Sequence, residues 1–161
     1  MSPLTNVSSP YAGSINYDFN VYVPTSCFVD HLTALEVLAD ETKLSCTLNE
    51  GTFHATERLP YANNFRPLTA LFFFCLNDCN NGDNKPGSLK LLLENGAREF
   101  INDRDLLINN QTPLETLFFM NSTDKKNKEI MAKMLLENGA EITEKAIRFA
   151  KSVGLEGVLN P

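Results

Sequence analysis

The sequence predicts an all-α protein, a short solenoid of stacked helix-loop-helix units, from three observations. Residues 89–97 return as residues 132–140, with Leu-Leu-Glu-Asn-Gly-Ala identical in both copies. A second block precedes each copy, because residues 67–74 correspond to residues 113–120. In both copies of residues 89–97, Leu-Leu-Glu-Asn is followed by a glycine, Gly96 or Gly139, where a helix would stop. Two blocks that recur in the same order indicate a structural repeat, and stacking lets each unit bury an apolar face that it cannot bury alone.

Each unit contains a helix start and a helix stop. Thr112-Pro113 is a start signal, since the hydroxyl can accept from a free N–H and proline at the first helical position loses no hydrogen bond. Gly96 and Gly139 follow Leu-Leu-Glu-Asn, where glycine supplies the left-handed conformation of a C-cap. The first helix of each unit is almost wholly apolar (residues 71–76 and 117–120), so it must be buried on several sides.

The N-terminal third fits this scheme less closely. Residues 1–29 are rich in Ser, Pro, Asn and Tyr and predict an irregular leader. Residues 30–65 predict a degenerate or capping repeat, because residues 33–38 echo residues 112–117. Its second helix stays open, since residues 44–56 alternate enough around Asn49-Glu50-Gly51 for a short β-hairpin.

The C-terminal end predicts half a repeat that closes the stack. Thr143 can cap a helix over residues 144–153, and Gly154 can end it. Residues 155–159 then begin another helix. Terminal repeats of a solenoid are commonly atypical in this way.

These motifs resemble the ankyrin repeat, which opens its first helix with Thr-Pro-Leu-His-x-Ala and closes its second with Leu-Leu-x-x-Gly-Ala. Here Thr112-Pro113-Leu114 and residues 135–140 match, and Pro67-Leu68 and residues 92–97 match in the preceding unit, where Arg66 replaces the capping threonine. The resemblance implies ankyrin-like repeats over residues 66–161, with the C-terminal half-repeat as a cap.

The units depart from the family pattern in two ways. The family histidine is replaced by Thr69 and Glu115, which leaves the usual inter-repeat hydrogen bonds open. The two prolines lie 46 residues apart rather than about 33, so the units are enlarged. Much of the excess is expected as loops over residues 77–87 and 121–128.

The resemblance also implies where a partner protein would bind. Ankyrin proteins usually meet their partners with loop tips and the exposed side of the first helices, and the enlarged loops are a second candidate. Ordinary solvated turns would fit the same loop residues equally well. Carried onto this chain, the positions are Asn64, Phe65, Arg66, Asn109, Asn110 and Gln111, with Thr69 and Glu115 beside them.

The net charge of the chain and the length of its apolar runs limit the kinds of partner that it can bind. The net charge of −6 and a pI of about 4.9 oppose binding to nucleic acid. Lys125, Lys126 and Lys128 form one basic spot, which is better explained as a solvated loop than as a contact for an acidic partner. The longest apolar run, residues 68–76, is too short to span a membrane. Residues 1–20 show no secretory signal and the four cysteines are scattered, so we expect a cytoplasmic protein.

The residues that could carry chemistry do not form a convincing site. Cys75 and Cys79 lack further metal ligands nearby, and an acidic loop at residues 78–83 lacks calcium-site spacing. Cys27 and His31 lie four apart without a hydrolase signature around them, and His54 has no partner that spacing identifies. We therefore expect no catalysis, no cofactor and no metal.

The sequence thus favours a non-catalytic protein-binding module that is a monomer when free. Because divergent ankyrin proteins with long loops occur among pathogen proteins delivered into host cells, the resemblance also suggests an effector of that kind. One alternative is a targeting or regulatory segment of a larger enzyme, which the ending at Asn160-Pro161 mildly favours. Another is a cysteine hydrolase that uses Cys27.

Overall fold

The computed structural model describes residues 31–59, 68–77, 85–106, 108–120 and 124–160. This part of the chain is mostly helical, with seven α-helices, two short 3₁₀ helices and one two-stranded sheet. The expected helical character is therefore confirmed. The predicted leader over residues 1–29 lies outside the described residues.

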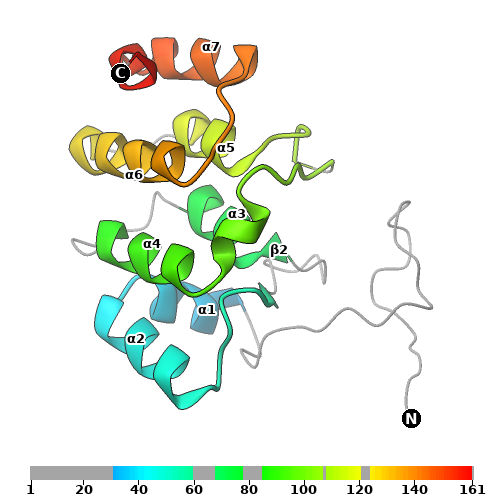
Figure 1. Cartoon of the computed structure of the whole chain (residues 1–161), viewed down its shortest axis with the longest axis vertical. Coiled ribbons are helices and arrows are strands. Elements are labelled where there is room, and N and C mark those ends of the chain that lie inside the picture. The colour runs from blue at the N-terminus through cyan, green and yellow to red at the C-terminus, as the bar shows by residue number, and fades with distance from the viewer. Residues whose placement is uncertain (1–30, 60–67, 78–84, 107, 121–123, 161) are drawn as a thin grey trace.

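Consecutive helices form pairs that lie in layers, one above the next (Figure 1). The first helices of successive pairs contact one another, α3 with α5 and α5 with α7. The second helices do the same, α2 with α4 and α4 with α6. The elements are α1 (His31–Leu38), α2 (Glu41–Glu50), α3 (Ala70–Leu76), α4 (Lys85–Glu94), η1 (Ala97–Phe100), α5 (Pro113–Phe119), α6 (Lys125–Glu137), α7 (Glu144–Ser152) and η2 (Glu156–Leu159).

The hairpin considered for residues 44–56 is wrong, because α2 continues through Glu50. The Asp40 carboxylate accepts from the backbone N–H groups of Thr42 and Lys43, and this N-cap starts the helix. Gly51 ends it with φ 75°. The caps at both ends therefore favour a helix more strongly than the alternating apolar residues favour a strand.

The small sheet lies further along the chain. Strand β1 (Arg58–Leu59) pairs antiparallel with strand β2 (Leu68–Thr69), with Arg58 opposite Thr69. These short strands contact α3, the helix that follows them directly. They join the first helix pair to the second.

The helix expected from Pro67 begins later, at Ala70. Thr69 caps it, since its hydroxyl accepts from the Phe72 N–H at 3.2 Å. Thr69 precedes Thr112 by 43 residues, the same interval that separates Leu92 from Leu135. Aligning the capping threonines, Thr69 and Thr112, therefore brings both blocks of the two units into correspondence with one constant offset. Aligning the prolines does not.

The other predicted caps and stops are confirmed. Thr112 forms a capping box with Glu115, and Thr143 caps α7 by accepting from the Ala146 N–H. Gly96 and Gly139 follow the two second helices with φ 111° and 100°. The segment after Gly154 forms the 3₁₀ helix η2 rather than a longer helix.

The loops between the helices of a pair are shorter than expected. Lys85–Gly87 already belongs to α4, and Lys125–Lys128 belongs to α6. Lys128 is buried, and its ammonium donates to the Met120 carbonyl at the C-terminal end of α5. A cation at this position is favoured by the partial negative charge of a helix C-terminus. Lys128 is thus structural. The predicted basic loop is wrong as a loop, because it forms the first turn of α6, where Lys125 and Lys126 are exposed to solvent.

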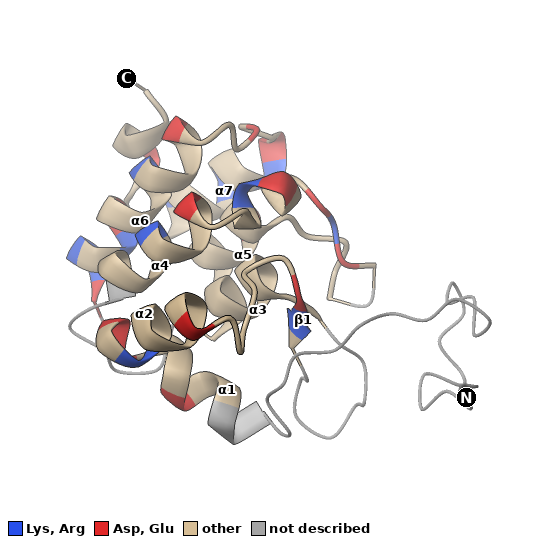
Figure 2. Ribbon diagram, turned by 60° about the horizontal axis from the view of Figure 1, so that its bottom comes forward, with Lys and Arg blue, Asp and Glu red and all other residues tan. Residues whose placement is uncertain are grey.

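The first helices form the centre of the core. Every residue of α3 is buried, as are the first six residues of α5. Figure 2 shows α3 without any charged residue. The expected exposed side of the first helices is therefore absent from α3 and from residues 113–118 of α5. Within the described residues, no helix combines the length and apolarity needed to cross a bilayer.

Candidate binding surface

The structure separates the predicted contact residues into three groups. Asn64, Phe65 and Arg66 lie outside the described residues. Asn109 and Asn110 are exposed on a loop, as predicted. The other three are buried and are wrong as contact residues: Thr69 is 7% exposed, Gln111 1% and Glu115 0%.

The buried members are held by hydrogen bonds inside the protein. Thr69 caps α3, as described above. The Gln111 side-chain oxygen accepts from the Thr116 hydroxyl at 2.9 Å. Because buried polar groups need partners, these side chains stabilise the start of each first helix instead of facing solvent.

Glu115 is the centre of a polar network that joins four residues. Arg104 donates to both of its carboxylate oxygens, at 3.0 and 3.3 Å. The Thr112 N–H donates at 3.0 Å, and the Thr143 hydroxyl also donates to the carboxylate. Thr143 belongs to the N-cap of α7, so one carboxylate connects two adjacent helix pairs. Glu115 thus makes a hydrogen bond between two successive helix pairs.

The network also fixes the charge of Glu115. Burial raises the pKa of its carboxyl, but hydrogen bonds from Thr143, Thr112 and Arg104 and the Arg104 charge lower it further than burial raises it. The pKa of Glu115 therefore lies below its ordinary value. The carboxylate is charged at neutral pH, which keeps all of its oxygens available as acceptors.

The loop before α5 is folded back on itself like a hairpin. Asp105 and Gln111 form an antiparallel bridge, in which the Asp105 N–H donates to the Gln111 carbonyl at 3.1 Å. Asn109 and Asn110 turn the chain with φ 57° and 54°, a left-handed conformation that asparagine tolerates better than most residues. Leu106, near the tip, is 60% exposed.

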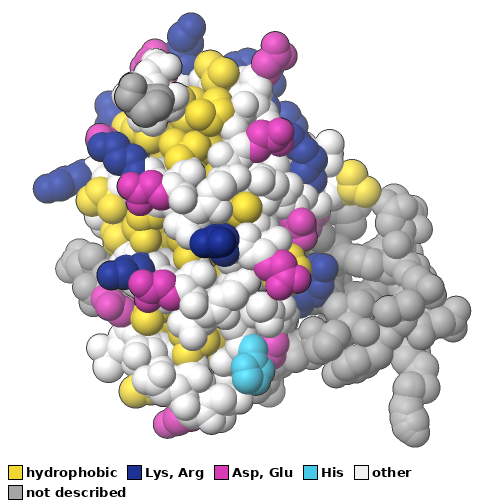
Figure 3. All heavy atoms as spheres, viewed as in Figure 1, with side chains coloured by type: hydrophobic (Ala, Val, Ile, Leu, Met, Phe, Trp, Pro, Cys, Tyr) yellow, Lys and Arg dark blue, Asp and Glu magenta, His cyan; other side chains and the backbone are white. Residues whose placement is uncertain are grey.

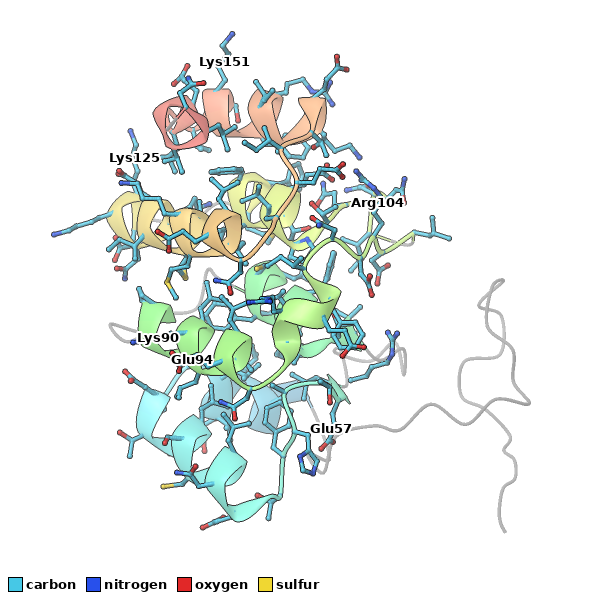
Figure 4. The ribbon with its side chains drawn as sticks, viewed as in Figure 1. Glu57, Lys90, Glu94, Arg104, Lys125 and Lys151 are labelled. Carbon is cyan, nitrogen blue, oxygen red and sulfur yellow. The ribbon has the colours of Figure 1, made fainter. Side chains whose placement is uncertain are left out.

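Side chains from outside the tip hold this loop in place. Arg104 donates to the Asn110 carbonyl at 2.6 Å, and Lys145 from α7 donates to the Asn109 carbonyl at 2.9 Å. Figure 4 places Arg104 within the loop, on the side of the molecule where η1 leads to α5. The backbone carbonyls of Asn109 and Asn110 thus accept hydrogen bonds from within the protein, while the two side-chain amides remain exposed.

A second tie joins the base of the loop to the following repeat. The Asn102 amide donates to the Gly139 carbonyl at 3.0 Å, and its side-chain oxygen accepts from the Glu141 N–H at 2.8 Å. The loop is therefore fixed to two successive helix pairs. A loop held in this way loses little conformational entropy when it binds a partner.

The exposed surface continues from the loop along α7 to the end of α5. Lys145 and Phe149 lie on one side of α7, four residues apart. The Phe149 ring lies 5.1 Å from the Phe119 ring, and Phe119 is 51% exposed. The loop–α7 surface, as we name it, consists of Leu106, Asn109, Asn110, Phe119, Lys145, Arg148 and Phe149.

Sequence reasoning missed the α7 part of this surface. Arg148, Phe149 and Phe119 lie outside the repeated blocks or at their ends, and the Phe119–Phe149 contact joins residues 30 positions apart. The available signal was the strong amphipathic pattern of residues 144–152, which leaves Ile147, Arg148 and Lys151 opposite the buried Ala146 and Ala150.

A concave region also lies between two of the second helices. A groove of about 840 Å³ runs between α4 and α6, with Leu93 and Met134 among its lining residues. Its charged residues are Lys90, Glu94, Arg98, Glu99 and Glu137. This mixture of both signs selects no particular class of ligand.

The residues considered for chemistry remain separate or lie outside the described part. Cys75 is buried in α3, while Cys27, Cys79 and the His31 side chain are not described. His54 is exposed. Among the described residues, no three His, Cys, Asp or Glu side chains gather closely enough to hold a metal ion.

No protein-family model matches the chain, and no curated protein and no solved structure is significantly similar to it.

Proposed function

We propose that this chain is a non-catalytic protein-protein interaction module of divergent ankyrin type, which binds its partner through the loop–α7 surface. The repeated blocks support the family. Both copies have a threonine-capped first helix, a second helix and a left-handed glycine, and the copies pack side by side. This is the arrangement by which a solenoid repeat buries its apolar first helix.

One observation carries the binding role: an exposed turn is held by hydrogen bonds from several sides. Arg104, Lys145 and Asn102 together fix the loop that presents Leu106, Asn109 and Asn110. An ordinary connecting loop needs no such support. A preorganised loop with an exposed leucine at its tip is well suited to contact another protein.

We place this binding in the cytoplasm. Cys46 is an exposed free thiol, and free thiols suit a reducing compartment.

The test compares partner capture by matched variants. In Leu106→Ser/Asn109→Gly/Asn110→Gly, glycine accepts the positive φ of the turn, so the loop keeps its shape but loses its contact side chains. We expect the variant to unfold like the wild type and to lose about tenfold in affinity for captured partners, as removal of binding hot spots does. Asn49→Ala, an exposed amide on α2, is the control and should bind as the wild type does.

Quantitative mass spectrometry of cross-linked proteins from a cell lysate gives the readout. Loss of the same proteins from the loop variant, but not from Asn49→Ala, supports the proposal. Equal recovery by all three proteins would show that the partner binds elsewhere. Failure of the wild type to enrich any protein would contradict the binding role itself.

A further inference from the structure

We infer that the last layer of the stack, formed by α7 and η2, holds the loop before α5 in its binding shape, so that docking of this layer regulates partner binding. This inference rests on the proposed function, because it concerns the loop of the loop–α7 surface. It adds a conformational control: the loop keeps its shape only while the last layer is docked.

The backbone carbonyls of the turn are held by one cation of the loop and one of the last layer. Arg104 donates to the Asn110 carbonyl at 2.6 Å, and Lys145 of α7 donates to the Asn109 carbonyl at 2.9 Å. Both asparagines have positive φ, a conformation that persists only where the surrounding structure supports it. Part of that support therefore comes from α7.

The position of Arg104 depends on the last layer as well. The buried Glu115 carboxylate accepts from Arg104 at 3.0 and 3.3 Å and also from the Thr143 hydroxyl, which belongs to the N-cap of α7. Departure of α7 would remove the Thr143 hydrogen bond and let water reach this carboxylate. Because water weakens an ion pair, Arg104 would then be held less firmly beside the turn.

The links between the loop and the last layer end on every second residue of one extended segment. Asn102 bonds to the Gly139 carbonyl at 3.0 Å and to the Glu141 N–H at 2.8 Å. The Glu115 link ends on Thr143, and the Asn109 link ends on Lys145. Alternate residues of an extended chain lie on the same side. This segment leads from α6 into α7, so movement of α7 would disturb all of these links together.

The last layer is held less firmly than the layers inside the stack. Figure 1 shows it at the end of the stack, where α7 contacts α5 and η2 contacts α6. The buried residues of α7 are Ala146 and Ala150, whose small side chains bury little apolar area. Its outward side carries the exposed residues Ile147 and Lys151.

One edge of the last layer is also incompletely covered. Figure 3 shows apolar side chains at the surface near the top of the view, where this layer meets α6. Val153 and Val158 are half-buried residues of this part of the chain. In a stack of repeats, stability is approximately a sum over neighbouring layers, so a layer with one neighbour opens at a lower free energy than an inner layer.

Opening of the last layer therefore competes with binding at the loop. A partner that recognises the shaped loop favours the docked layer, and by linkage docking favours the partner. The apparent affinity falls in proportion to the fraction of molecules in which the layer is docked.

Native-state hydrogen exchange of the full-length protein, followed by NMR, tests the coupling. The loop amides of Ile108 and Gln111, which donate to the Asp105 and Ile108 carbonyls, are the probes. Ala150→Gly weakens α7 from within the helix. We expect these amides and the Ile147 amide of α7 to exchange about fivefold faster in this variant.

Two further variants make this test specific. Ser45→Gly, a glycine inside α2 at the other end of the stack, is the matched control and should leave the loop amides unchanged. In Lys145→Met/Asn102→Ala, which removes two of the links, the loop amides should exchange faster from the start. Adding Ala150→Gly to that variant should then accelerate Ile147 but no longer the loop, which a purely structural role of Lys145 would not produce.

A variant with the last layer open tests the effect on binding. Ala146→Asp places a carboxylate at a fully buried position, which disfavours docking of α7. In the cross-linking experiment it should lose the same proteins as the loop variant. Slow exchange of the Asn95 amide, which donates to the Leu91 carbonyl of α4, would show that the rest of the stack remains folded.

Several results would overturn the inference. Loop amides that ignore Ala150→Gly, or that respond equally to Ser45→Gly, would show that the loop does not depend on the last layer. The same follows if Lys145→Met/Asn102→Ala leaves the response intact, or if Ala146→Asp exchanges rapidly at Ile147 yet captures partners normally.

Failure of the coupling and failure of the proposed function give different results. If the loop variant loses its partners while the loop amides ignore Ala150→Gly, the binding role stands and only its control by α7 fails. If the loop amides follow α7 but the loop variant captures every partner, the coupling stands as a property of the fold, and its role in binding fails with the proposed surface.

Discussion

The Thr143 hydroxyl donates a hydrogen bond to the buried Glu115 carboxylate, although the two residues belong to successive helix pairs. The same threonine accepts from the Ala146 N–H and so caps α7. Glu115 in turn holds Arg104, which supports the exposed turn at Asn110. Glu115 therefore joins two successive helix pairs, contacts the residue that caps α7 and holds Arg104 beside the exposed loop.

Replacing Glu115 should destabilise the protein markedly. In Glu115→Ala, the Thr112 N–H and the Thr143 hydroxyl lose their acceptor, and Arg104 loses its ion pair. Because Arg104 is 35% exposed and can still reach water, we expect a loss of about 2–3 kcal/mol in the free energy of unfolding. Urea denaturation measures it, with exposed Glu94→Ala as the control at about 0.5 kcal/mol or less.

The contribution of Glu115 should vary with pH in a defined direction. Its pKa is lowered in the folded protein, so its charge stabilises the fold at every pH above its ordinary value of about 4.5. This contribution is lost as pH falls through the folded-state pKa. The difference in unfolding free energy between wild type and Glu115→Gln should be constant from neutral pH to about pH 5 and shrink below it. A difference that grows on acidification would contradict the lowered pKa.

The repeated blocks made most of the helix pairs predictable. Capping threonines and left-handed glycines act within a few residues, so Thr112, Thr143, Gly96 and Gly139 could be assigned from the sequence. The start of α3 could not, because the proline signal and the threonine cap lie two residues apart and the cap determines where the helix begins.

The burial of Glu115 was predictable only in part. Threonine followed three residues later by glutamate is the spacing of a capping box, and that signal stood in the sequence. A carboxylate is nevertheless expected at the surface unless it is paired. Its partners Arg104 and Thr143 come from a preceding loop and the following repeat, and only the fold brings them together.

The exposed turn should tolerate glycine better than alanine. Asn109 and Asn110 both have positive φ, which strains a side chain with a Cβ and no compensating amide. Asn109→Ala/Asn110→Ala should lower the free energy of unfolding by about 1 kcal/mol for each residue, and the thermal midpoint should fall with it. Asn109→Gly/Asn110→Gly should match the wild type. Equal loss in both variants would show that the amides, rather than the backbone, stabilise the turn.

Gly139, after α6, allows backbone strain to be measured separately from steric clashes. A Cβ on Gly139 would meet no atom within 4 Å, yet its φ is 100°. Gly139→Ala should therefore cost about 1–2 kcal/mol through conformation alone. Gly157→Ala in η2 is the matched control, because it also meets nothing within 4 Å and has no positive φ, so its midpoint should stay unchanged or rise slightly.

The Asn102 side chain should measure how firmly the loop is tied to the next repeat. Asn102→Ala removes the donor to the Gly139 carbonyl and the acceptor for the Glu141 N–H, at a cost of about 1 kcal/mol because both bonds are exposed to water. Asn102→Asp keeps only the acceptor, so its free energy of unfolding should lie between those of the wild type and Asn102→Ala. Hydrogen exchange at the Glu141 amide should therefore quicken in Asn102→Ala and remain slow in Asn102→Asp. An unchanged exchange rate in Asn102→Ala would mean that helix packing alone fixes the position of the loop, without the Asn102 hydrogen bonds.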